Sequence, residues 1–125
     1  ENFQTLSTLA QVLQATGRAE EAKSTLDGAV AHRSAAPTDI HVVARQLQAQ
    51  GKKDEAVRMF ELNARRFPGE WPTDVGMMRA WAAKGDAKKA LEAARRAHAK
   101  APDPGNRQNL ERLIARLEQG DTAIN

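Results

Sequence analysis

The sequence contains no cysteine, and only 4% of its 125 residues are aromatic. The missing cysteines exclude disulfides and thiolate metal sites, and they leave the redox compartment undecided. No apolar run approaches the roughly 20 residues that a membrane-spanning helix needs. The net charge is only +3, so overall charge gives weak evidence for nucleic-acid binding. What remains is a chain of one domain's length, in which small aliphatic residues must supply most of the core.

A ten-residue phrase occurs three times, each time around a glycine. Gly17, Gly51 and Gly85 are spaced 34 residues apart, and an alanine follows each of them five positions later. A fixed period of this length indicates stacked helix pairs, because a glycine with positive φ can end one helix and let the next begin. The alanine then lies where the two helices approach most closely. We therefore predict an all-α fold of three helix-turn-helix units and a C-terminal capping helix, about seven helices in all.

The positions of glycine and proline set the expected boundaries within a single domain. We place the units at about residues 2–36, 37–70 and 71–103, the capping helix at about 104–119 and a tail at 120–125. In the first unit, Leu6, Leu9, Val12 and Leu13 fall at helical spacing and predict one buried stripe. The last helix has one apolar and one highly charged face, as expected where no further unit covers its outer side.

The stretch from about residue 2 to residue 102 resembles tetratricopeptide repeats. In that family a small turn residue is followed by an alanine, a large apolar residue and a closing proline, as in Gly51, Ala56, Phe60 and Pro68. The copies are divergent: Asp74 stands where the first helix of a unit usually carries tryptophan. The resemblance implies an α-α superhelix that serves as a protein-interaction module or scaffold.

A narrower resemblance covers residues 71–125. It is similar to the helical tail of certain bacterial secreted proteins that carry a β-rich domain of unknown function upstream. The similar segments are Trp71-Pro72, Lys84-Gly85-Asp86, Asn109-Leu110-Glu111 and the closing Ile124-Asn125. This resemblance implies an extracytoplasmic or periplasmic parent. The chain also begins at Glu1 without a methionine or an apolar leader, so we expect an excised domain or a processed product whose N-terminal domain is missing.

The sequence predicts no catalytic or metal site. His32, His41 and His98 belong to different units, and none has another His, Asp or Glu at the i, i+4 spacing of a helical metal site. The serines have no nucleophile-elbow context, and the glycine turns do not precede a helix in the manner of a phosphate-binding loop. We therefore expect no enzyme, no cofactor and no bound metal.

Polar residues on the first helix of each unit predict a ligand groove, because these helices line the concave side of a repeat stack. By the family's pattern the candidates are Gln11, Gln14, His41, Arg45, Gln48, Arg79 and Arg116. Amides and arginines suit the main chain of a peptide and an acidic side chain or terminal carboxylate. The family's carboxylate clamp is not reproduced, so chaperone-tail recognition is not predicted. The alternative is that these arginines are simply solvated.

Two other functions stay open. The module could be a structural appendage that docks on the missing N-terminal domain of the same protein and stabilises it. Alternatively, the face between Lys84 and Lys100, with six basic residues and two acidic ones, could bind nucleic acid. No aromatic side chains interleave with these charges, and the i, i+4 pairs Lys88–Glu92 and Glu92–Arg96 account for part of them. A protein or peptide partner, either acidic or the missing N-terminal domain of the same protein, is therefore our prediction, with no membrane partner and with nucleic acid as the weakest alternative.

Overall fold

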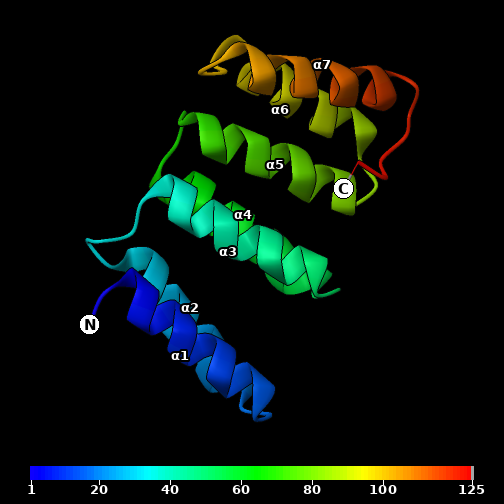
Figure 1. Ribbon diagram of the computed structural model, residues 1–125. Helices are drawn as coiled ribbons and strands as arrows, with labels where there is room; N and C mark the ends of the chain where they lie inside the picture. Colours follow the sequence, from blue (N-terminus) through cyan, green and yellow to red (C-terminus); the bar gives the residue numbers. More distant parts are fainter. Residues whose placement is uncertain (125) are drawn as a thin grey trace.

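The computed structural model describes residues 1–124, which form seven α-helices and no strand (Figure 1). The helices are α1 (Phe3–Ala15), α2 (Ala19–Ala31), α3 (Pro37–Ala49), α4 (Lys53–Arg66), α5 (Trp71–Ala83), α6 (Ala87–Ala99) and α7 (Pro104–Glu118). Consecutive helices pair as hairpins α1–α2, α3–α4 and α5–α6, and α7 packs on α6. The predicted all-α stack of helix pairs with one additional C-terminal helix is confirmed.

Three glycines occupy equivalent bends inside the hairpins. Gly17, Gly51 and Gly85 have φ of +81°, +78° and +80°, in the left-handed region that side-chain-bearing residues avoid. The residue after each glycine donates its N–H to the carbonyl five positions back, at 2.8 to 2.9 Å. This bond satisfies a carbonyl that the helix end leaves without a partner. The repeated phrase is therefore a helix-stop signal used three times.

The junction between the second and third hairpins is densely packed. Phe60 of α4 is 1% exposed and lies against α5 at Gly76. A Cβ atom added to Gly76 would lie 2.8 Å from Phe60 Cδ1, so only glycine allows this approach. The imidazole of His41 packs on the same phenyl ring, with centroids 5.5 Å apart. Helix α4 runs along α5 through this contact, which fuses the two hairpins into one body.

The departure from the family pattern at Asp74 is compensated by cations from the third hairpin. The Asp74 side chain is 9% exposed, and its carboxylate accepts from Lys100 Nζ at 2.7 Å and from Arg96 Nε at 3.4 Å. A buried carboxylate is tolerated when charged donors surround it. Neither expected pair of Glu92, with Lys88 or with Arg96, is among the ion pairs of residues 1–124, and Arg96 pairs with Asp74 instead.

The junction between the first and second hairpins is looser and more polar. Within residues 1–124, α2 packs against α4 but has no contact with α3 like that of α4 with α5. Arg58 of α4 pairs with Asp27 of α2, and Arg66 Nη1 donates to the Val30 carbonyl and, at 2.6 Å, to the His32 carbonyl. Charged side chains of α4 thus hold the end of α2.

The stripe predicted on the first helix is only partly buried. Leu13 is buried and Leu6 is half-buried, but Leu9 and Val12 are 47% and 53% exposed. The buried face of α1 consists instead of Phe3, Ser7, Ala10 and Leu13. Because no hairpin among residues 1–124 lies beyond α1, its remaining apolar residues meet solvent.

Candidate interaction surface

The structure does not gather the seven predicted groove residues into one place. Gln11 and Gln14 border a cleft between the first and second hairpins. His41, Arg45, Gln48 and Arg79 lie together on α3 and α5. Arg116 is at the end of α7, against the segment that follows it. The three locations differ in the groups that fill them.

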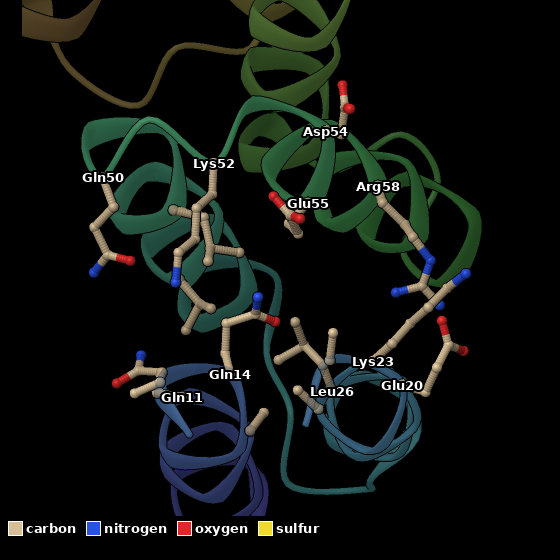
Figure 2. A pocket seen from close by; sticks show the side chains of 16 residues that line it. Gln11, Gln14, Glu20, Lys23, Leu26, Gln50, Lys52, Asp54, Glu55 and Arg58 are labelled. Carbon is tan, nitrogen blue, oxygen red and sulfur yellow. The ribbon is translucent and has the colours of Figure 1, made fainter. Parts of the chain in front are cut away.

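The cleft between the first two hairpins has a volume of about 450 Å³ (Figure 2). Aliphatic side chains form part of its lining, namely Ala10, Ala22, Leu26, Val43 and Leu47. Polar and charged side chains also line it, namely Gln11, Gln14, Glu20, Lys23, Gln50, Lys52, Asp54, Glu55 and Arg58. Figure 2 shows Gln14 directed into the cleft and Asp54 directed away from it. Charges of both signs surround this space, so it shows no preference for an acidic ligand.

The second location is a positively charged cluster of His41, Arg45 and Arg79. Burial, and next the nearby charges of Arg79 and Arg45, lower the pKa of His41 to about 4, although a hydrogen bond with the Pro72 backbone acts in the opposite direction. Burial and the charge of Arg45 lower the pKa of Arg79 to about 10. The imidazole is therefore neutral at pH 7 and the guanidinium is charged. Two neighbouring arginines make this the most concentrated positive charge among the predicted groove residues.

The cluster has donor capacity that the described part of the chain does not use. Among residues 1–124, no Asp or Glu pairs with Arg45 or Arg79, and the buried His41 Nδ1 and Arg79 Nε have no hydrogen-bond partner. Arg45 Nη1 donates to Gln48 Oε1 at 2.6 Å, which holds the guanidinium against α3. The unpaired Nε–H of Arg79 is a buried donor, and an acceptor or anion placed there would relieve its cost, whereas the unpaired Nδ1 of the neutral His41 is an acceptor.

The third location holds the segment Asp121–Ile124, which turns back from α7 onto α5. Arg116 Nε donates to Asp121 at 3.0 Å, and Arg116 Nη2 donates to the Ala123 carbonyl. The Ala123 N–H and the Arg116 side chain both lower the pKa of the Asp121 carboxyl. Arg79 Nη1 donates to the Ile124 carbonyl at 3.2 Å. Two of the predicted groove arginines are therefore engaged with the main chain of the protein's own C-terminal segment.

The basic face between Lys84 and Lys100 is largely neutralised by acidic residues elsewhere in the fold. Lys84 pairs with Glu61, Arg95 pairs with Glu118, and Arg96 and Lys100 share Asp74. Lys84 and Lys89 also lie over the Trp81 ring, 4.8 and 4.4 Å from its centroid. Sequence reasoning missed these partners because they come from other helices. This pairing leaves little open charge for a phosphate backbone.

Other site chemistries find no support in the described part of the chain. No group of three or more His, Cys, Asp or Glu side chains within residues 1–124 could hold a metal ion. Over the same residues, no helix is both long and apolar enough to cross a bilayer.

Comparison with known proteins places part of this architecture in a family. Residues 4–27, which cover α1 and most of α2, match the family described as tetratricopeptide repeat. No curated protein and no solved structure shows significant similarity to the chain. Tetratricopeptide repeats generally mediate interactions between proteins and are generally not enzymes. The match covers 24 of the 125 residues, and beyond it the stack of seven helices in residues 1–124 has an all-α, tetratricopeptide-like repeat fold.

Proposed function

We propose that the protein is an interaction module whose surface on α3 and α5 binds an acidic peptide segment of a partner protein. The observation that carries the proposal is the cluster of His41, Arg45 and Arg79. It concentrates two positive charges and the buried, unpaired Nε–H donor of Arg79, with no acidic side chain among residues 1–124 to balance them. Guanidinium groups bind carboxylates and main-chain carbonyls through several parallel donors, which suits an extended acidic peptide.

The proposal is tested with an array of synthetic peptides in which each acidic peptide has a lysine-substituted counterpart. We expect the wild-type chain to bind acidic members selectively, and the Arg45→Gln, Arg79→Gln double variant to bind them at least about tenfold more weakly, equivalent to about 1.4 kcal/mol. The double variant Arg95→Gln, Arg112→Gln is the matched control, because it also removes two positive charges, from α6 and α7, where Arg95 pairs with Glu118 and Arg112 donates to Asn109. Undiminished binding by the double variant, or no binding by the wild type, contradicts the proposal.

A second candidate is a structural appendage that docks through α1 on another domain of the same protein. The exposed Leu9 and Val12 favour it, because aliphatic residues at helical spacing on an uncovered helix offer an apolar contact surface. A Leu9→Ser, Val12→Ser variant would then lose the domain contact and keep peptide binding. The reverse result favours the peptide-binding function.

A further inference from the structure

The last described segment of the chain lies in a position that a bound peptide could take. Gly120, with φ of +81°, ends α7 and reverses the chain direction. Figure 1 shows the chain then running back alongside the stack to end next to α5. Residues 121–124 form no helix or strand. The segment is therefore short, irregular and laid across helices that precede it by some 40 residues, as its Arg79 contact shows.

One side chain anchors this segment. Ile124 is 2% exposed and belongs to the apolar cluster that α5, α6 and α7 form around Met78, Leu113 and Leu117. Ala123, its neighbour, is exposed, and Thr122 is half-buried. A single deeply buried aliphatic residue among shallower neighbours is typical of an anchor residue in peptide recognition.

The polar contacts of the segment go mainly to its backbone. The Ile124 and Ala123 carbonyls accept from Arg79 and Arg116, and the Ala123 N–H donates to Asp121 Oδ1 at 2.9 Å. Side chains that bind main-chain carbonyls recognise an extended backbone and do not discriminate between sequences. Specificity then comes from the aliphatic anchor, and another extended peptide with such an anchor could satisfy the same donors.

We infer that Asp121–Ile124 is a displaceable, built-in ligand of the tail site, which consists of Arg79, Arg116 and the apolar cluster around Met78, and that the partner is an extended peptide that places its own aliphatic side chain in the position of Ile124. This inference rests on the proposed function and adds an anchor residue and a competitor to it. Arg79 links the proposed acidic-peptide surface to the segment Asp121–Ile124, because it contacts the Ile124 carbonyl and lies beside Arg45 in the positive cluster.

Competition within one molecule sets the expected size of the effect. A ligand tethered by a short linker acts at an effective concentration of about 1 mM. An outside peptide binds only those molecules in which the tail has left the tail site. Its apparent affinity is therefore the intrinsic affinity multiplied by the fraction of such molecules. If the tail occupies the tail site about 90% of the time, loss of tail binding raises the affinity for an outside peptide by about tenfold.

Isoleucine-methyl NMR on the full chain follows the tail directly. The chain has three isoleucines, Ile40, Ile114 and Ile124, so the spectrum is simple to assign. The probe is a synthetic peptide with the sequence of residues 118–125, and its matched control carries serine in place of isoleucine. On titration with the probe we expect the Ile124 methyl signal to move toward the shift of a solvent-exposed isoleucine. We expect the Ile40 signal to stay, because Ile40 is buried in the core around α3 and α4.

Two full-chain variants give the second measurement. Ile124→Ser removes the anchor, and Asp121→Ala removes the contact with the exposed Arg116 without touching the core. We expect Ile124→Ser to bind the probe about tenfold more tightly than the wild type, and Asp121→Ala to show a smaller gain. Adding Arg79→Gln to Ile124→Ser should abolish the gain. Circular dichroism melting confirms that each variant is folded.

The outcomes separate this inference from the proposed function. An Ile124 signal that does not move at saturating probe, or equal affinity of Ile124→Ser and wild type, overturns the inference even if acidic peptides bind the cluster on α3 and α5. If acidic array peptides bind neither the wild type nor Ile124→Ser, the proposed function fails, and the inference, which rests on it, fails with it.

Discussion

The two junctions between hairpins follow the same 34-residue period but are filled differently. At the second junction, Phe60 inserts against Gly76 and the helices touch along their length. At the first, a cleft of about 450 Å³ opens between the two hairpins, and the ion pair of Arg58 with Asp27 spans the junction. A repeat stack is stabilised by nearest-neighbour contacts, so its stability is set junction by junction. The comparison indicates that a shared repeat does not guarantee equal coupling between neighbours.

The largest expected effect tests the dense junction. Phe60→Ala should lower the free energy of unfolding by about 3–5 kcal/mol, because it leaves a cavity that the surrounding helices cannot close. Leu26→Ala, which lines the cleft at the loose junction, should cost only about 1–2 kcal/mol, because solvent already reaches that site. Urea unfolding of both variants measures the difference. Equal costs would show that the two junctions are equally packed.

The next effect is a dependence of stability on pH that arises at the dense junction. The pKa of His41 is about 4 in the folded chain against about 6.5 when unfolded. As the pH falls from 6.5 to 4, the unfolded chain takes up a proton that the folded chain does not, so stability decreases and then levels off below pH 4. The loss should approach about 3 kcal/mol, since each pKa unit corresponds to about 1.4 kcal/mol.

His41→Gln removes this titrating group and should flatten the stability profile between pH 6.5 and 4. Denaturant melts at pH 7, 5.5 and 4 measure the slope in both proteins. A slope in the variant as steep as in the wild type would assign the pH dependence to other groups.

The smallest effects come from two helical glycines, one packed at the dense junction and one exposed on α2. Gly76→Ala should destabilise the protein by about 1–3 kcal/mol, because its methyl group would overlap Phe60. Gly28→Ala, inside α2, should stabilise it by about 0.5–1 kcal/mol, because no atom lies within 4 Å of the added Cβ and alanine favours a helix. Thermal melts give the sign of each change. A stabilising Gly76→Ala would contradict the close contact of Gly76 with Phe60.

The sequence predicted most of the fold because its signals are local and repeated. A glycine followed by an alanine five residues later is visible in one copy and confirmed by two others, and the structure places Gly17, Gly51 and Gly85 in equivalent bends. The buried polar residues were not predictable in the same way. Asn63 is 1% exposed and donates to the Pro37 carbonyl at 3.0 Å, and Asp74 finds Lys100 and Arg96 across the hairpin. Such partners depend on distances in the folded structure, which the 34-residue sequence repeat does not specify.

The candidate groove was predictable only in part. The pattern of first helices indicated Arg45 and Arg79, which the structure brings together, but it also grouped them with Gln11 and Gln14, which border a different space. The segment at Ile124 had no helical spacing to reveal it, since one aliphatic residue after a glycine forms no stripe. Its importance comes from where α7 directs the chain, and this is a property of the folded stack.

The contacts of Arg58 and Arg66 with the end of α2 make the position of the first hairpin sensitive to ionic strength. Charges that are partly exposed, as the 30% and 44% exposed side chains of Arg58 and Asp27 are, lose their attraction when dissolved ions screen them. The apolar contact of Phe60 with α5 has no such dependence. Raising the ionic strength should therefore loosen α1 and α2 first and leave α3 to α7 associated. The width of the cleft between the first two hairpins would then vary with the salt concentration of the solution.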